Sequence, residues 1–273
     1  MKFTCRRKCA SVALISLVLL IGNQPLSAQA ANSDIAMRTQ QLNSLFEELW
    51  QYQLRIDPEM ATTMGDNRYN GRLTDRSPEF QHSSLEEEKK YLARFQSIKA
   101  DGLAPQDVTS LELMIRGLKE EIEGAQFKSW EMPVNQMGGP HLDPIDLISL
   151  MPFTTVTDYE NYLSRLRQIP HMLEQVTANM RQGLADHIMP PRYLLEKVVV
   201  QSQEVSEKTG EESPFAKPIK NFPSTISAEE QQRLRSAALD TINEEIVPAY
   251  QRFTNFVRTD YAPHGRTEPG VWA

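Results

Sequence analysis

Apolar residues recur at three- and four-residue steps along most of this chain, and that helical spacing limits its fold more than any other feature. The clearest case is the stripe formed by Val108, Leu111, Ile115, Leu118 and Ile122. Such a stripe lies on one face of a helix and needs a neighbouring helix to cover it. The alternation typical of strands is absent, and the β-branched run at 198–200 lies within a helical pattern. The spacing therefore predicts an all-α protein, an antiparallel bundle-like array of about seven helices.

Local signals predict where these helices begin and end. Asp57-Pro58 and Ser77-Pro78 each combine an N-cap side chain with a proline at the first helical position. Capping boxes, in which a hydroxyl residue is followed three positions later by glutamate, are predicted at Thr157/Glu160 and Ser227/Glu230. We predict helices over residues 33–56, 58–65, 78–100, 108–122, 157–184, 192–208 and 228–261. Pro170 should kink or split the helix that contains it.

Two proline-rich segments interrupt the helical pattern. Residues 128–152 hold four prolines and the pair Gly138-Gly139, and residues 209–225 hold three more prolines. Both are predicted to be long loops, apart from a turn or two of helix after Pro144. Long loops inside a compact domain are usually functional.

The first 30 residues are typical of a cleavable secretory signal. Four basic residues within the first eight positions precede an apolar run at 10–21, and Ala28, Ala30 and Ala31 form an A-x-A site with cleavage before Ala31. Twelve residues rise only about 18 Å as a helix, short of the ~30 Å hydrocarbon core of a bilayer. We therefore predict export to the periplasm or the exterior, with no stable membrane anchor after cleavage.

Cleavage changes the composition of the chain. Both cysteines, Cys5 and Cys9, lie within the signal, so the mature domain, residues 31–273, has no disulfide or thiolate chemistry. Four basic residues and no acid are lost, which changes the formal net charge from −7 to −11. This acidity disfavours nucleic acid and anionic membrane surfaces as partners.

Motifs that carry chemistry are scarce. There is no H-E-x-x-H, no C-x-x-C in the mature chain, no G-x-S-x-G and no glycine-rich phosphate loop. His171 and Glu174 have the spacing of one half of a metal site, but a solvated pair explains them better. His141 lies near Asp143 and Asp146, where turn and cap chemistry is the simpler interpretation. The residues alone predict no catalytic residue, no metal site and no cofactor.

Several segments together nevertheless resemble a known family. They are LFEELWQYQLRIDPEMATTMGDNRYNGRLTD at 45–75, DYENYLSRLRQIPHMLEQVTANMRQGLADHIMPPR at 158–192, SPFAKPIKNFP at 213–223, VPAYQRFTNFVRTDYAP at 247–263 and the final PGVWA. In this order they are similar to the N-terminal half of the domain of unknown function 885 family, over nearly the whole mature chain.

The resemblance implies exported bacterial proteins that look like zinc-dependent peptidases with a larger, gluzincin-like helical fold. Their metal motif, His-Glu-Ala-x-Pro-Gly-His-His, would bind zinc through its histidines and use the glutamate as general base. No residue here matches that motif, so no catalytic residue carries over. With a loop-like end at Trp272, we expect a chain that stops before the metal-binding half: a truncated product, a fragmentary gene model or half of a split protein.

The resemblance also suggests candidate residues for one wall of a substrate cleft. They lie in two loops: Asp66, Arg68 and Tyr69 in the first, and Gln136, Gly138, Gly139 and His141 in the second. Arg68 could hold the carboxylate of a peptide-like substrate in a bidentate pair, although turn chemistry or a local ion pair would explain each residue more simply. The expected partners are such a substrate or the metal-binding half. A non-catalytic envelope scaffold or binding protein is the alternative, and an enzyme with an unrecognised carboxylate centre is a more distant one.

Overall fold

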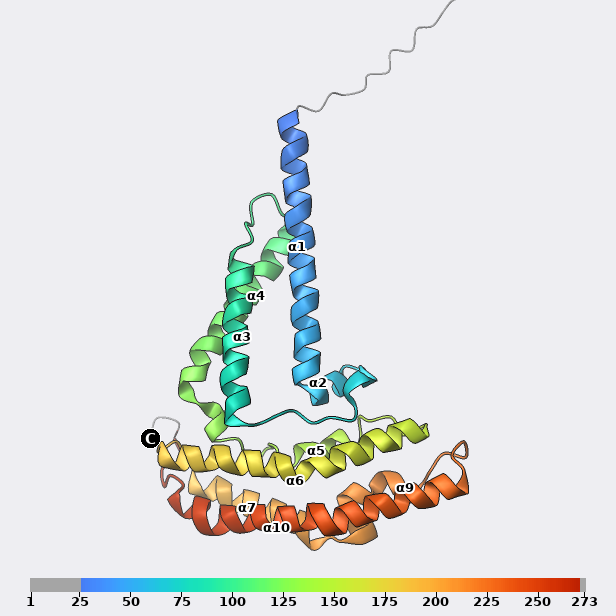
Figure 1. Ribbon diagram of the computed structural model, residues 1–273. Helices are drawn as coiled ribbons and strands as arrows, with labels where there is room; N and C mark the ends of the chain where they lie inside the picture. Colours follow the sequence, from blue (N-terminus) through green and yellow to red (C-terminus); the bar gives the residue numbers. More distant parts are fainter. Residues whose placement is uncertain (1–25, 271–273) are drawn as a thin grey trace, which may run out of the picture.

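The computed structural model describes residues 26–270, and these residues form an all-α protein (Figure 1). The basic segment and apolar run of the predicted signal, together with Val271, Trp272 and Ala273, lie outside the described residues. The predicted cleavage residues Ala28, Ala30 and Ala31 fall in the first turns of α1 (Leu26–Ile56), which begins earlier than the predicted residue 33. No helix in the described range is long and apolar enough to span a bilayer.

The first of two units consists of three helices that lie side by side: α1, α3 (Pro78–Gln96) and α4 (Pro105–Gly124). Their apolar stripes meet in a core of their own, in which the rings of Phe46 and Phe95 lie 5.2 Å apart. In α1 the apolar residues Leu42, Leu45, Leu49 and Leu54 recur at helical spacing and are buried. Trp50, at the edge of this stripe, is 39% exposed.

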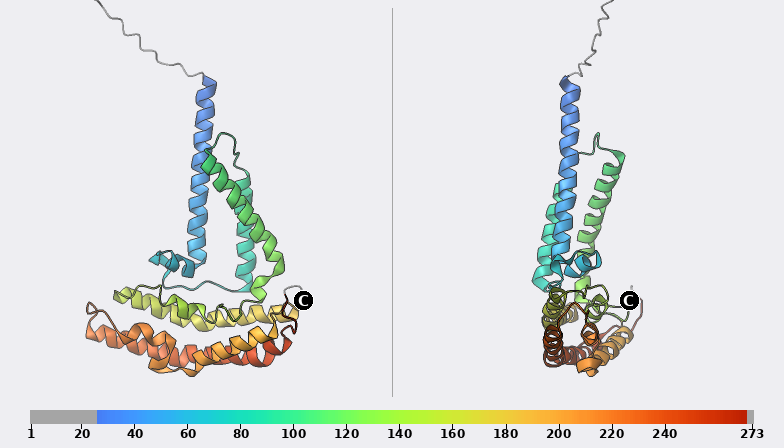
Figure 2. Two further views of the ribbon diagram at one scale, coloured as in Figure 1. Left: turned by 180° about the vertical axis from the view of Figure 1, so that it is seen from behind. Right: turned by 90° about the vertical axis from the view of Figure 1, so that its right-hand side faces the viewer.

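The second unit is a layer of long helices that crosses the foot of the first unit (Figures 1 and 2). It contains α6 (Val156–Ala185), α7 (Arg192–Glu207), α9 (Ala228–Thr241) and α10 (Val247–Phe256). Successive helices alternate in direction, so that α6 and α9–α10 run the same way with α7 opposed to them. Their buried faces form the larger core, which includes Leu166, Val198, Tyr250 and Phe253.

Helix starts follow the predicted local chemistry, with one change of register. Asp57 accepts a hydrogen bond from the backbone N–H of Met60 at 2.8 Å and starts α2 (Pro58–Thr63). Ser77 caps α3, and Ser227 caps α9. The capping box predicted at Thr157/Glu160 was wrong. Thr155 and Asp158 form it instead, because T-x-x-D at 155–158 satisfies the same pattern two residues earlier.

The long helices accommodate their prolines and are not split by them. α6 continues through Pro170 with a bow near its middle (Figure 1), so a split did not occur. Pro248 follows a π-helical segment, Ile242–Ile246, and a second one, Val257–Tyr261, follows α10. Because proline lacks an N–H and its ring collides with the carbonyl four residues earlier, a wider turn before Pro248 relieves that collision.

The proline-rich segments contain short helices joined by irregular chain. Residues 128–152 include α5 (Asp143–Leu147), which confirms a turn of helix beside Pro144, and residues 209–225 include α8 (Lys217–Lys220). Within the described residues, β-structure is limited to the isolated bridges Asn135–Gly138 and Pro191–Arg266. Short 3-10 turns lie at Asn67–Tyr69, Ala125–Phe127, Ser129–Glu131, Gly210–Glu212, Pro214–Ala216 and Ala262–His264.

Candidate functional site

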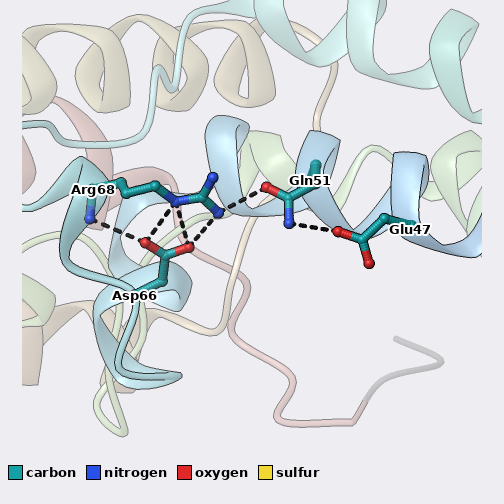
Figure 3. Close-up of polar contacts among 4 residues, drawn as sticks. All are labelled: Glu47, Gln51, Asp66 and Arg68. Atoms are coloured by element: carbon teal, nitrogen blue, oxygen red, sulfur yellow. Dashed lines mark hydrogen bonds and ion pairs between the residues drawn. The ribbon is translucent and has the colours of Figure 1, made fainter.

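The first predicted loop is closed on itself by an ion pair (Figure 3). Asp66 caps the turn at 67–69, and Arg68 donates from Nε to both carboxylate oxygens of Asp66 at 2.9 Å and from Nη2 to Oδ2 at 2.5 Å. Nη2 also donates to Gln51 of α1 at 2.7 Å, and Gln51 in turn donates to Glu47 at 2.9 Å. These hydrogen bonds from Arg68 lower the pKa of Asp66. The Nε/Nη2 edge that would clamp a substrate carboxylate is therefore already occupied.

Tyr69, the third candidate of this loop, packs against arginine side chains. Its ring lies 5.4 Å from the guanidinium carbon of Arg68 and 6.0 Å from that of Arg72. Cation–π contacts of this kind are worth about 0.5–1 kcal/mol at exposed sites. Tyr69 thus helps to hold the loop in shape.

A buried arginine that the sequence reasoning missed joins this region to the second unit. Arg165 of α6 is 3% exposed and donates to the carbonyls of Arg72 at 2.8 Å and Pro58 at 3.0 Å and to the hydroxyl of Thr62 at 2.7 Å. Burial lowers the pKa of Arg165 to about 10, so the guanidinium remains charged at neutral pH. The cation is held by oxygen dipoles, and no carboxylate of residues 26–270 accepts a hydrogen bond from it.

Further polar side chains of α6 fix the chain that links α2 to α3. Ser164 and Gln168 donate to the carbonyl of Gly71, at 2.7 and 2.8 Å. Farther along, Gln175 accepts from the backbone N–H of Arg76 at 3.0 Å, and Asn179 donates to the carbonyl of the same residue at 2.7 Å. We call these contacts, together with those of Arg165, the α6 seam. The seam fixes the angle between the two units, because residues 71–76 have no regular structure of their own.

The second predicted loop is anchored in the larger core. His141 is fully buried, and its Nε2 lies 3.1 Å from Oε1 of Gln201 in α7. Gln201 donates from Nε2 to the carbonyl of Gln136 at 3.1 Å, which leaves its Oε1 to accept the Nε2–H of His141. Burial lowers the pKa of His141, so the ring is neutral at pH 7. Tyr250 donates to the His141 carbonyl at 2.9 Å and ties the loop to α10.

The two glycines of this loop have different roles. Gly139 has a φ of +129°, and a Cβ at this position would lie 2.6 Å from the carbonyl oxygen of Pro133. Gly138 has no atom within 4 Å of a Cβ position, and its carbonyl accepts from the Asn135 N–H at 3.2 Å. Gly139 is therefore required by the turn, whereas Gly138 is not.

The structure does not bring the two groups of candidates together. Within the described residues, no hydrogen bond or ion pair joins Asp66, Arg68 and Tyr69 to the loop at 136–141. A depression of about 330 Å³ lies instead at the corner where α2 and α5 approach each other. Its lining comes from α2, α5 and the chain next to them: Asp57, Glu59, Met60, Thr63, Arg76, Asp143, Asp146, Leu147 and Leu150. We call it the corner depression. Its volume is at the lower end of the ~300–1,000 Å³ typical of ligand sites.

The corner depression carries more acid than base. Of its four carboxylates, Asp143 pairs with Arg76, with Nη2 and Oδ2 3.4 Å apart, and Asp57 caps α2. Glu59 accepts from the Thr74 backbone at 3.0 Å and from its hydroxyl at 2.5 Å. The carboxylates of the corner depression would favour the cationic or hydrogen-bond-donating parts of a ligand.

The residues that the structure describes do not fit a zinc site. His171 and Glu174 lie 3.9 Å apart on the exposed face of α6, and His141, next to Asp143, is buried against Gln201. From residue 26 to residue 270, no three histidine, cysteine, aspartate or glutamate side chains converge, whereas a zinc ion needs at least three protein ligands.

A carboxyl pair with one buried member, Glu131, lies where residues 128–131 meet the end of α6. Glu131 is 2% exposed and is hydrogen-bonded to Asp186, which Lys128 also contacts through an ion pair. Desolvation and the charge of Asp186 raise the pKa of Glu131, while the hydrogen bond from Lys128 lowers the pKa of Asp186. As pH falls, Glu131 therefore takes up a proton before Asp186 does.

Glu131→Gln should stabilise the protein at pH 8 and have little effect near pH 4. The folded state raises the pKa of Glu131 and so binds more protons than the unfolded chain above pH 4.5, and this costs stability as pH rises. Glutamine mimics the protonated carboxyl at every pH. Thermal unfolding of both proteins at several pH values measures the difference in stability, where 1 kcal/mol corresponds to a shift of about 2–4 °C in Tm. An equal effect of the substitution at pH 4 and pH 8 would contradict this assignment.

The fold and the site together describe an all-α protein, and the comparisons with known proteins agree with this fold class. The chain matches the family described as "Bacterial protein of unknown function (DUF885)" over residues 58–271. The protein therefore belongs to the DUF885 family.

A solved structure is similar to the chain over most of its length. It is described as "the putative lipoprotein from Colwellia psychrerythraea", with a TM-score of 0.78 at 20% sequence identity. The match covers 86% of this chain and 43% of that structure, so this chain spans less than half of its relative's length. No protein of curated function matches the chain. At this level of identity the likeness establishes the fold.

Proposed function

We propose that the chain is the exported N-terminal helical portion of a zinc-dependent peptidase or hydrolase, in which its corner depression forms one wall of the substrate cleft. The observation that carries the proposal is the family match over residues 58–271 combined with 43% coverage of a longer helical relative. The metal ligands would come from the family motif, which no residue of this chain matches.

The arrangement of the two units supports the role of a wall. α1, α3 and α4 stand across the layer of α6–α10 (Figure 1), and the α6 seam holds that angle through Arg165, Gln168 and Asn179. The corner depression lies between α2 and α5, and its lining residue Arg76 is held by the α6 seam through Gln175 and Asn179. A cleft wall must hold such an angle, because misplacement by about 1 Å can cost roughly 10²-fold in rate.

Export is the second part of the proposal. It rests on the basic residues, apolar run and A-x-A site within the first 31 residues. The name of the Colwellia psychrerythraea relative, a lipoprotein, agrees with a location in the cell envelope. In this chain both cysteines precede the apolar run, so cleavage would leave no cysteine to carry a lipid.

The chain by itself should bind no stoichiometric zinc and cleave no peptide. It would be expressed with its own N-terminal segment and purified without chelators, and then assayed for zinc content and for cleavage of a fluorogenic peptide library. We expect no activity with or without added zinc, because no three ligands converge in the described residues. One zinc ion per chain, with chelator-sensitive cleavage that co-purifies with the protein, would contradict the proposal.

A further inference from the structure

A small groove between α6 and α10 has a lining unlike the rest of this acidic protein. It encloses about 180 Å³ between Pro170 and Arg181 on one helix and between Ala249 and Phe256 on the other. Its floor is apolar and includes the buried residues Leu173, Ala249 and Phe253. The groove is separate from the corner depression, with which it shares no lining residue.

Two arginines stand at the rim of this groove with most of their hydrogen-bonding capacity unused. Arg252 makes one loose ion pair, 3.8 Å from Glu174, and its side chain is 62% exposed. Arg181 lies over the ring of Phe256 at 5.0 Å. Within the described residues, neither guanidinium donates a hydrogen bond. The charged rim has a net charge of +1, in a chain whose net charge is −7.

We propose that this groove binds a carboxylate that carries a small apolar body. The carboxylate would accept charge-assisted hydrogen bonds from Arg181 or Arg252, and guanidinium groups suit that geometry. The apolar body would cover Leu173 and Phe253. The volume is below the ~300–1,000 Å³ of sites for drug-sized ligands, so the enclosed part is one side chain or a short acyl segment. The C-terminal residue of a peptide and a short fatty acid share this chemistry.

Calorimetric titration of the full chain tests the groove with three probes. They are acetyl-alanyl-leucine, the same dipeptide with a C-terminal amide, and hexanoate. We expect at least one of the two carboxylates to bind in the millimolar range, more weakly as salt is added, and the amide to bind at least about tenfold more weakly than its acid. Binding of the dipeptide acid alone identifies a peptide C-terminus as the ligand, and binding of hexanoate alone identifies a fatty acid.

Substitutions at the exposed rim decide whether the groove is the site. Arg181→Gln and Arg252→Gln should each weaken carboxylate binding by about tenfold, since a hydrogen bond to a charged group is lost. Arg167→Gln provides a matched control, because Arg167 is an exposed arginine of the same helix outside the groove, and this change should leave the affinity as it was. Absence of binding by both acids, equal binding of acid and amide, or equal affinities in all three variants would overturn the proposal.

Discussion

Replacing Arg165 with methionine should destabilise the protein by about 2–4 kcal/mol, roughly 5–15 °C in Tm. The guanidinium donates to oxygens of Pro58, Thr62 and Arg72, and methionine would remove all three hydrogen bonds. The Pro58 carbonyl would keep the Thr62 hydroxyl as a donor. Removing a buried cation recovers part of the loss, since its desolvation is no longer required. Arg165→Lys should recover little, because an ammonium cannot span the same fork of acceptors.

The control for this prediction is Arg167→Met, two residues later in the same helix. Arg167 is exposed, and its replacement should change stability by less than about 0.5 kcal/mol. Urea unfolding followed by circular dichroism at 222 nm measures both variants. A loss for Arg165→Met no greater than that for Arg167→Met would show that the α6 seam does not depend on the buried guanidinium.

Replacing Gly139 with alanine should lower the free energy of unfolding by about 2–4 kcal/mol, because it combines backbone strain with a steric collision. At a φ of +129° an L-residue is strained, and the new Cβ would lie 2.6 Å from the Pro133 carbonyl oxygen and 3.3 Å from the Val134 Cα. Neither neighbour is a flexible side chain, so the loop itself must move. That movement would also disturb His141, two residues later, and its contacts with α7 and α10.

The adjacent glycine provides the matched control. Gly138→Ala places a methyl group in open space without a positive φ, and it should be neutral or stabilising by up to about 1 kcal/mol. The two substitutions add the same methyl group one residue apart. Changes of opposite sign in the free energy of unfolding would therefore show that the conformation of Gly139 causes the loss. Equal changes in the midpoint of thermal unfolding would contradict the structural role given to this turn.

The features that could be predicted from the sequence are those encoded by near neighbours. Asp57 and Ser77 lie next to the prolines that follow them, and both cap helices as expected. The stripe at Leu111 and Leu118 is buried because helical periodicity fixes which face it occupies. The capping box of α6 was missed by two residues because Thr155 and Thr157 offer the same local pattern.

The candidate site was less predictable because its contacts are long-range. Arg165 reaches acceptors 93 and 107 positions earlier in the chain, and nothing near it in the sequence marks it as buried. His141 was a candidate cleft residue because it lies in a proline-rich loop. Its partner Gln201 is 60 residues later in the sequence, and the local pattern does not show that His141 is buried in the core. Arg68 differs, since its partner Asp66 is only two residues away and a local ion pair was the simpler interpretation from the start.

The measurement that most directly tests the proposed function is zinc-dependent hydrolysis after reconstitution. The chain would be co-expressed with the metal-motif half of a longer family member, and the activity of the purified complex would be measured on peptides. We predict a complex with chelator-sensitive hydrolysis, whose kcat/KM falls when Asp146 of the corner depression is changed to asparagine. The matched change Asp101→Asn, at an exposed aspartate outside the corner depression, should leave kcat/KM unaltered. A stable complex without hydrolysis, or hydrolysis unaffected by Asp146→Asn, would contradict the role of this chain as a wall of the cleft.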